Sequence, residues 1–216
     1  MVNEIDRKIF EFAYSMALRD AVLQKAYKGM NKKTLLDNKE AAVIVEKYIQ
    51  GVFKGEDPDF YTTEEAVERY FKVFIEDNNL MTESGTPAAF TFGNTQKLVN
   101  MTAKYMFLSA YNDSKKKALF NCCHCPMDGI MIEKVISEID KLKDIDKVAL
   151  CEKSVLKSVK PDMYLSNGWR QLLRVPWSQI TLDDHRIYDE FQMIVRFLSD
   201  KEGLIPVEYD FIHWAE

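Results

Sequence analysis

The chain has little glycine and proline, with eight and six residues among 216. It also has no segment in which apolar and polar residues alternate as they do in a half-buried strand. Lysine, glutamate, leucine and methionine are common instead, so the composition predicts an all-α, multi-helix globular bundle. With 47% hydrophobic residues, one domain over 1–216 can bury a sizeable core, and two lobes, 1–85 and 86–216 with a cleft between them, are the alternative.

No uncharged apolar run is long enough to cross a bilayer. The N-terminus, MVNEIDRKIFEFAYSM, carries acidic residues early and lacks the apolar region of a signal peptide. We therefore expect a cytoplasmic protein with no membrane partner and with reduced cysteines, and we expect a monomer. The net charge of −5 argues against a chain that coats nucleic acid through bulk electrostatics.

Separated pairs of metal ligands are missing as well. Cys122, Cys123, His124 and Cys125 are consecutive and cannot close a tetrahedral zinc site by themselves, and no further Cys-x-x-Cys or His pair supplies the rest. We predict no metal, no disulfide among these residues and no cofactor, and we interpret the thiols as buried, with a helix-capping role. Nucleophilic cysteine chemistry with His124 is the alternative.

Apolar residues at helical spacing place the expected helices along the chain. They cover residues 4–30, 39–53, 62–75, 95–108, a segment that starts at 126, 142–159, 169–175 and 183–198. An aromatic-rich tail at 206–216 is expected to dock on them.

Residues 92–136 hold the features that suggest chemistry. Gly93 and Asn94 can form a turn, with Asn94 or Thr95 as the N-cap of a helix that carries Lys97 in its first turn. Pro126 suits a first helical position, so that Asp128 lies in the first turn of a second helix capped by Cys125. The helix dipole stabilises a carboxylate there and makes a free amine easier to reach on a first-turn lysine.

The same stretch is basic. Between residues 91 and 125, one acidic residue opposes five lysines, at positions 97, 104, 115, 116 and 117. A basic strip on an acidic body can contact a phosphate backbone, and a solvated loop is the alternative. We therefore predict DNA contacts from six residues: Gly93, Asn94, Lys104, Lys115, Lys116 and Lys117. Phe92 and Trp214 are predicted walls of a base pocket, since a flipped base stacks on aromatic faces.

The stretch resembles the helix-hairpin-helix DNA glycosylase superfamily. Residues 93–97, Gly-Asn-Thr-Gln-Lys, are similar to the end of the family's hairpin, and Pro126-Met127-Asp128 resembles its Pro-Val-Asp. The separation of Lys97 and Asp128 is most like that of the archaeal 8-oxoguanine branch. Two features depart from the pattern: no Leu-Pro-Gly-Val-Gly hairpin is present, and Gly129 stands where threonine or serine commonly follows the aspartate.

The resemblance implies a helix-hairpin-helix glycosylase fold and base excision from double-stranded DNA. In that reaction Lys97 attacks the sugar C1′ and Asp128 assists, with oxidised purine as the preferred substrate. Removing an exposed charge usually changes stability by about 0.5 kcal/mol or less, so we expect Lys97→Gln to fold normally. Two alternatives remain: a non-catalytic helical interaction or adaptor protein in which Lys97 and Asp128 are structural, and a degenerate glycosylase that binds DNA without cutting it.

Overall fold

The computed structural model describes residues 4–23, 39–53, 91–156, 168–181 and 183–214. Every regular element within these ranges is a helix and none is a strand, which confirms the predicted all-α class. In chain order the elements are α1 (Glu4–Leu23), α3 (Lys39–Phe53), α6 (Phe92–Ala110), α7 (Ser114–Ala118), α8 (Gly129–Lys141), α9 (Asp144–Glu152), α11 (Trp169–Leu173), the 3₁₀ helix η3 (Trp177–Gln179), α12 (Arg186–Glu202) and α13 (Pro206–His213).

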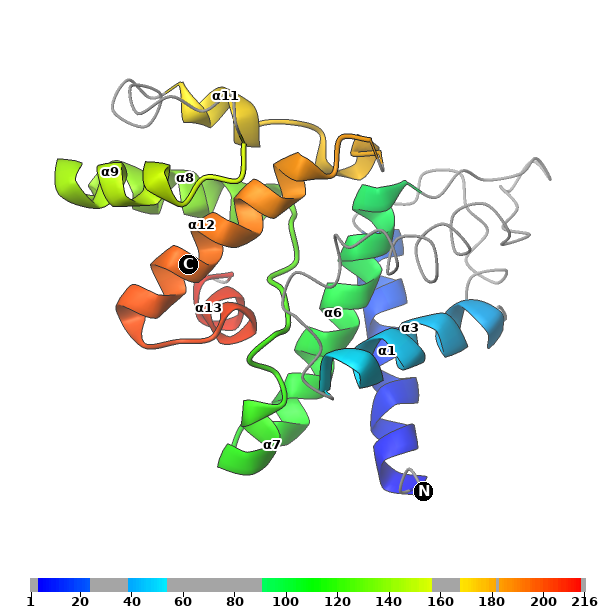
Figure 1. The fold of residues 1–216 in the computed structure, drawn as a ribbon. Helices are drawn as coiled ribbons and strands as arrows, with labels where there is room; N and C mark the ends of the chain where they lie inside the picture. Colours follow the sequence, from blue (N-terminus) through cyan, green and yellow to red (C-terminus); the bar gives the residue numbers. More distant parts are fainter. Residues whose placement is uncertain (1–3, 24–38, 54–90, 157–167, 182, 215–216) are drawn as a thin grey trace.

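Helix α6 lies at the centre of the molecule (Figure 1). It packs against α1 and α3 on one side and contacts η3 and α13 elsewhere on its surface. Most of its residues are buried, including polar ones, as expected for a helix that is covered all round. The side chain of Thr91 caps it by accepting a hydrogen bond from the backbone N–H of Asn94 at 3.0 Å.

Helices α8, α11, α12 and α13 pack together on the side of α6 away from α1 (Figure 1). Helix α12 ends at Glu202 and is capped by Gly203, whose φ of 70° is a left-handed conformation that glycine adopts without strain. Pro206 then starts α13 at a position where its missing N–H costs nothing. This turn returns the chain so that α13 packs on α6, α8 and α12, and the predicted docking of the tail is confirmed.

The segment between α7 and α8 runs between α6 and α12, held by two glutamine side chains. Gln192 accepts from the Cys125 N–H at 3.1 Å and donates to the Cys125 carbonyl at 2.7 Å. Gln96 does the same for Met127, at 3.2 Å and 2.9 Å. The side-chain amides thus satisfy buried backbone groups that no secondary structure pairs, and they fix the residue that follows, Asp128.

Several predicted boundaries are corrected by these contacts. Helix α6 begins at Phe92, so Gly93 and Asn94 are helical and do not form a turn. Asp128 is itself the N-cap of α8, because its side chain bonds the Met131 N–H, whereas Cys125 is engaged by Gln192. The helix predicted at 142–159 covers Asp144–Glu152, and the last long helix begins at Arg186. The predicted helix at 62–75 and the lobe boundary at 85 lie outside the described residues.

Among the helices that the structure describes, none is long and apolar enough to span a membrane.

Gly93 is required by a close approach of two backbones. A Cβ at this position would lie 1.8 Å from the carbonyl oxygen of Trp177, and the Gly93 N–H donates to the Ile180 carbonyl at 3.0 Å. We expect Gly93→Ala to lower the free energy of unfolding by at least about 2 kcal/mol, because η3 must move away from α6.

Chemical denaturation measures this effect, and Gly129→Ala is the matched control. Gly129 is the first residue of α8, and a Cβ there meets no atom within 4 Å. The control should be neutral or slightly stabilising, since alanine is the better helix former. Equal stability of the two variants would contradict the close contact between α6 and η3.

Candidate active site

Lys97 and Asp128 form a direct ion pair. The Lys97 Nζ lies 3.0 Å from the Asp128 Oδ2 and donates a hydrogen bond to it. Lys97 is the sixth residue of α6 and lies in its second turn, not in the predicted first turn, whereas Asp128 is the N-cap of α8. The exposed fractions of the two side chains are 0% and 5%. The expectation of an exposed lysine at position 97 is therefore wrong.

Asp128 uses its two oxygens for different tasks. Oδ2 accepts from Lys97, while Oδ1 accepts from the Met131 N–H at 3.0 Å and caps α8. The helix N-terminus stabilises negative charge at this position, so the carboxylate is held by a cation and by a helix dipole together. Its orientation is consequently fixed toward the amine.

The indole of Trp177 completes the surroundings of the Lys97 amine. The Nζ lies 4.9 Å from the ring centroid, within the range of a cation–π contact. Trp177 belongs to η3, which Gly93 allows to pack on the start of α6. The lysine amine thus lies close both to a carboxylate that can accept its proton and to an aromatic face.

A second buried pair lies beside the first. Lys104 follows Lys97 by about two helical turns, which places both lysines on one side of α6. Its Nζ lies 2.6 Å from the Asp210 Oδ2 of α13, with exposed fractions of 7% and 1%. The Asp210 Oδ1 has no hydrogen-bond partner among the described residues. Lys104 was predicted to contact DNA at the surface, but in the structure it is buried in this ion pair.

The two pairs act electrostatically as one cluster. Burial raises the pKa of Asp210 to about 6; the nearby Lys104 and Lys97 oppose this rise, and the carboxylate of Asp128 adds to it. Cys125 lies close enough to the cluster that Asp210 and Asp128 add to the rise in its thiol pKa, which is caused mainly by burial. A change of charge at any of these groups therefore changes the electrostatic environment of the Lys97–Asp128 pair.

The raised pKa of Asp210 predicts a specific pH dependence of stability. The folded protein binds the proton with a pKa of about 6 and the unfolded chain with the ordinary value of 3.8. This carboxyl therefore destabilises the folded state above pH 6, and that cost is relieved as the pH falls toward 4. Between pH 7 and pH 4, the stability of wild type relative to Asp210→Asn should rise by roughly 2 to 3 kcal/mol.

Urea denaturation of both proteins across this pH range tests the prediction. Groups outside this cluster titrate in both proteins, and their contributions cancel in the difference. A stability difference that stays constant with pH would contradict a buried, titrating carboxyl at position 210.

The aromatic residues predicted to form a base pocket lie in different places. Trp214 is 41% exposed, and its ring centroid is 5.1 Å from the Lys104 Nζ, so it flanks the cluster. Phe211 lies 6.0 Å from the same amine. Phe92 is fully buried and its ring packs edge-on against Tyr188, so it is a core residue in this structure.

The residues predicted to contact DNA do not form one continuous surface. Lys115 and Lys116, on α7, are exposed. Lys117 is half-buried and pairs with Glu208 at 2.6 Å. Gly93, Asn94 and Lys104 are buried. The basic strip in the sequence is thus divided between an exposed helix end and the buried face of α6.

The cysteine and histidine cluster at residues 122–125 is mostly buried. All four cysteines are free, and burial raises the pKa of the Cys123 and Cys125 thiols far above their usual range. Such thiols stay protonated and are poor nucleophiles. The His124 Nδ1 lies 2.8 Å from the Tyr188 hydroxyl. Within the described ranges, no group of three or more His, Cys, Asp or Glu side chains is placed to hold a metal.

The contacts of Asp210 and Trp177 with the two buried lysines were not predicted from the sequence. Asp210 precedes Trp214 by one helical turn, so an acidic residue on the side of the tail that carries the tryptophan was a usable signal. Trp177 gave no comparable signal, because it reaches Lys97 only through the packing of η3 on α6.

Comparison of the chain with protein-family models, with curated proteins and with solved structures finds no match. The function is therefore inferred from the residues and their geometry.

Proposed function

We propose that the protein is a DNA glycosylase and lyase that excises a damaged base, preferably an oxidised purine, through a Schiff base on Lys97. The observation that carries this proposal is the 3.0 Å contact between the Lys97 Nζ and the Asp128 Oδ2. These two residues are the ones that the resemblance assigns to catalysis, and they are 31 positions apart. The proposed fold is correspondingly a helix-hairpin-helix glycosylase fold.

The chemistry follows from the pair. Asp128 accepts a proton from the Lys97 ammonium, and the freed amine attacks C1′ of the damaged nucleoside. The bond from C1′ to the base breaks, and its electron pair leaves with the base, which takes up a proton. Opening of the sugar ring gives a Schiff base between Nζ and C1′. Loss of a C2′ proton then eliminates the 3′ phosphate and cuts the strand, and water releases the enzyme.

Lys97 must be uncovered for this reaction, because its side chain is fully buried. In the proposed mechanism, binding of a flipped nucleotide displaces side chains that cover the amine. Trp214 is partly exposed beside Lys104 and offers a face on which the base can stack. The exposed Lys115 and Lys116 supply contacts to the DNA backbone.

A second candidate function is that of a non-catalytic helical interaction protein. The complete burial of Lys97 favours it, since a buried ion pair can serve the fold alone. A degenerate glycosylase, which binds DNA without cutting it, shares the features of both candidates.

Incubation of wild type with duplexes that each carry one lesion distinguishes the three candidate functions. Release of a base together with strand cleavage is the result expected of the enzyme. Binding with a steep salt dependence but no product would indicate the degenerate glycosylase. If the protein binds none of the duplexes, the result would favour the non-catalytic interaction protein.

A further inference from the structure

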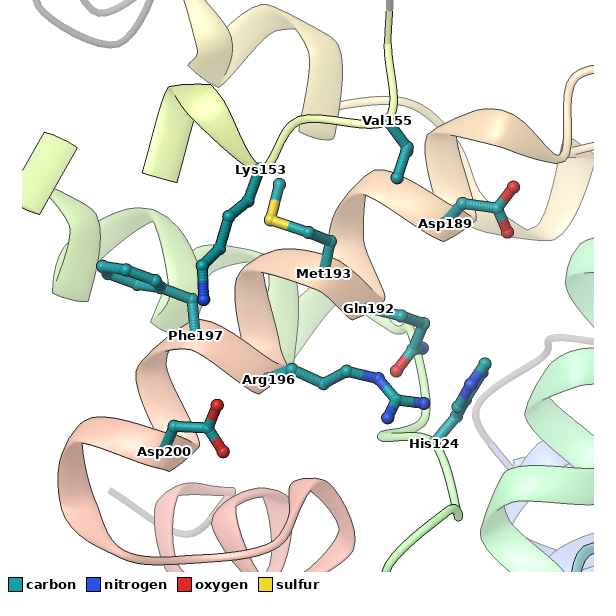
Figure 2. Close-up of a pocket in the computed structure, with 9 residues that line it drawn as sticks. All are labelled: His124, Lys153, Val155, Asp189, Gln192, Met193, Arg196, Phe197 and Asp200. Atoms are coloured by element: carbon teal, nitrogen blue, oxygen red, sulfur yellow. The ribbon is translucent and has the colours of Figure 1, made fainter. Parts of the chain in front are cut away.

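A cavity of about 430 Å³ lies between α12, the end of α9 and the segment that carries His124 (Figure 2). This volume is within the range of small-molecule sites. His124 also bonds Tyr188, whose hydroxyl accepts from Asn100, which in turn donates to Gln96. The cavity thus shares one wall with the network that positions Met127 and Asp128, although it is separate from the lysine pairs.

Two cations and two carboxylates line this cavity. Figure 2 shows the Arg196 side chain extending toward His124 and Gln192, and the Lys153 side chain reaching toward Phe197. Asp189 and Asp200 lie near opposite ends of the group. The Lys153 Nζ is 5.5 Å from the Phe197 ring centroid. Lys153 and Asp200 are both exposed.

This arrangement specifies the chemistry of a ligand. A guanidinium and an ammonium that reach one cavity suit a phosphate group, which Arg contacts with two parallel N–H groups. An ionised carboxylate only accepts hydrogen bonds, so Asp200 suits a ligand that carries hydroxyl groups. The side chains of Val155 and Met193 provide an apolar wall for the carbon face of a sugar ring. We propose that the cavity binds a small sugar phosphate, with its phosphate on Arg196 and Lys153 and a hydroxyl on Asp200.

Calorimetric titration of the full chain with ribose 5-phosphate tests the proposal, with ribose and inorganic phosphate as separate titrants. Ribose 5-phosphate should bind and raise the melting temperature, and ribose should do neither. Loss of one charge-assisted contact should weaken binding by about tenfold or more in Arg196→Gln and in Lys153→Gln. Lys153 is exposed, so its variant keeps the test valid if Arg196→Gln does not fold.

Two further variants sharpen the result. Asp200→Asn should weaken the binding of ribose 5-phosphate but leave inorganic phosphate unaffected. Lys141→Gln removes an exposed lysine of α8 that pairs with Glu138, and it should bind like wild type. A dissociation constant for ribose 5-phosphate weaker than about 10 mM, or equal binding by wild type and both cation variants, would overturn the proposal.

The phosphate could also come from a DNA backbone, and an undamaged duplex distinguishes the two sources. If the duplex binds wild type more tightly than Lys153→Gln while ribose 5-phosphate does not bind, the cavity belongs to DNA and the sugar phosphate proposal fails. No damaged base is used, so the outcome is independent of whether Lys97 is a nucleophile.

Discussion

Lys97→Gln is expected to abolish the covalent protein–DNA adduct that borohydride traps with wild type on a damaged duplex. A glutamine amide has no nucleophilic lone pair and cannot form a Schiff base. The loss of the adduct should be complete, because the Lys97 Nζ is the amine that donates a hydrogen bond to the Asp128 carboxylate. Denaturing gels of borohydride-treated reactions measure the adduct directly.

The same substitution should also destabilise the fold, contrary to the expectation for an exposed lysine. Lys97 is fully buried, and its removal leaves the charge of Asp128 buried without its cation. The expected loss is about 3–5 kcal/mol, as for other buried pairs that lose one partner. An inactive Lys97→Gln variant is therefore informative only if it is shown to be folded.

A double variant separates chemistry from stability. In Lys97→Gln with Asp128→Asn, both charges are removed, and asparagine retains the N-cap of α8. We expect this protein to recover part of the lost stability and still to form no adduct. Lys141→Gln is the surface control and should leave stability and adduct unchanged. An adduct that persists in the folded double variant would assign the nucleophile to another residue.

Asp128→Asn is expected to have the second largest effect. Asparagine can cap α8 but cannot take the proton from Lys97, so the rate of adduct formation should fall by about 10²- to 10⁴-fold. Affinity for the damaged duplex should stay nearly constant, since the predicted backbone contacts at Lys115 and Lys116 are untouched.

Single-turnover rates and equilibrium binding on the same duplex separate these two quantities. In Asp128→Asn protein that is shown to be folded, loss of binding in parallel with the rate would mean that Asp128 only supports the structure. An unchanged rate would remove Asp128 from the proton transfer.

The helices were predictable because their signals are local. Apolar residues at helical spacing predicted a helix over 95–108, and two of them, Leu98 and Met101, are buried in α6. The other side of α6 carries Lys97, Asn100 and Lys104 and so has the composition of a solvent-exposed face. All three residues are nevertheless buried. The elements that help to cover them, η3 and α13, come at least 70 residues later in the chain, and a periodic pattern in one helix does not report such contacts.

The pairing of Lys97 with Asp128 was predicted from a family resemblance and from the expected positions of helix ends, and neither of these indicates that the pair is buried. What brings the two together is the double hydrogen bond between the Gln96 amide and Met127. Glutamine within a helix carries no signal for such a long-range contact, so this part of the site required the structure.

The most direct test of the central proposal is to locate the covalent bond. Wild type is incubated with a duplex that carries 8-oxoguanine, reduced with borohydride, digested with nuclease and protease, and analysed by mass spectrometry. We expect a sugar remnant on the Nζ of Lys97. A remnant on Lys104 or on another amine, or no remnant with this lesion or any other in a panel, would contradict the proposal.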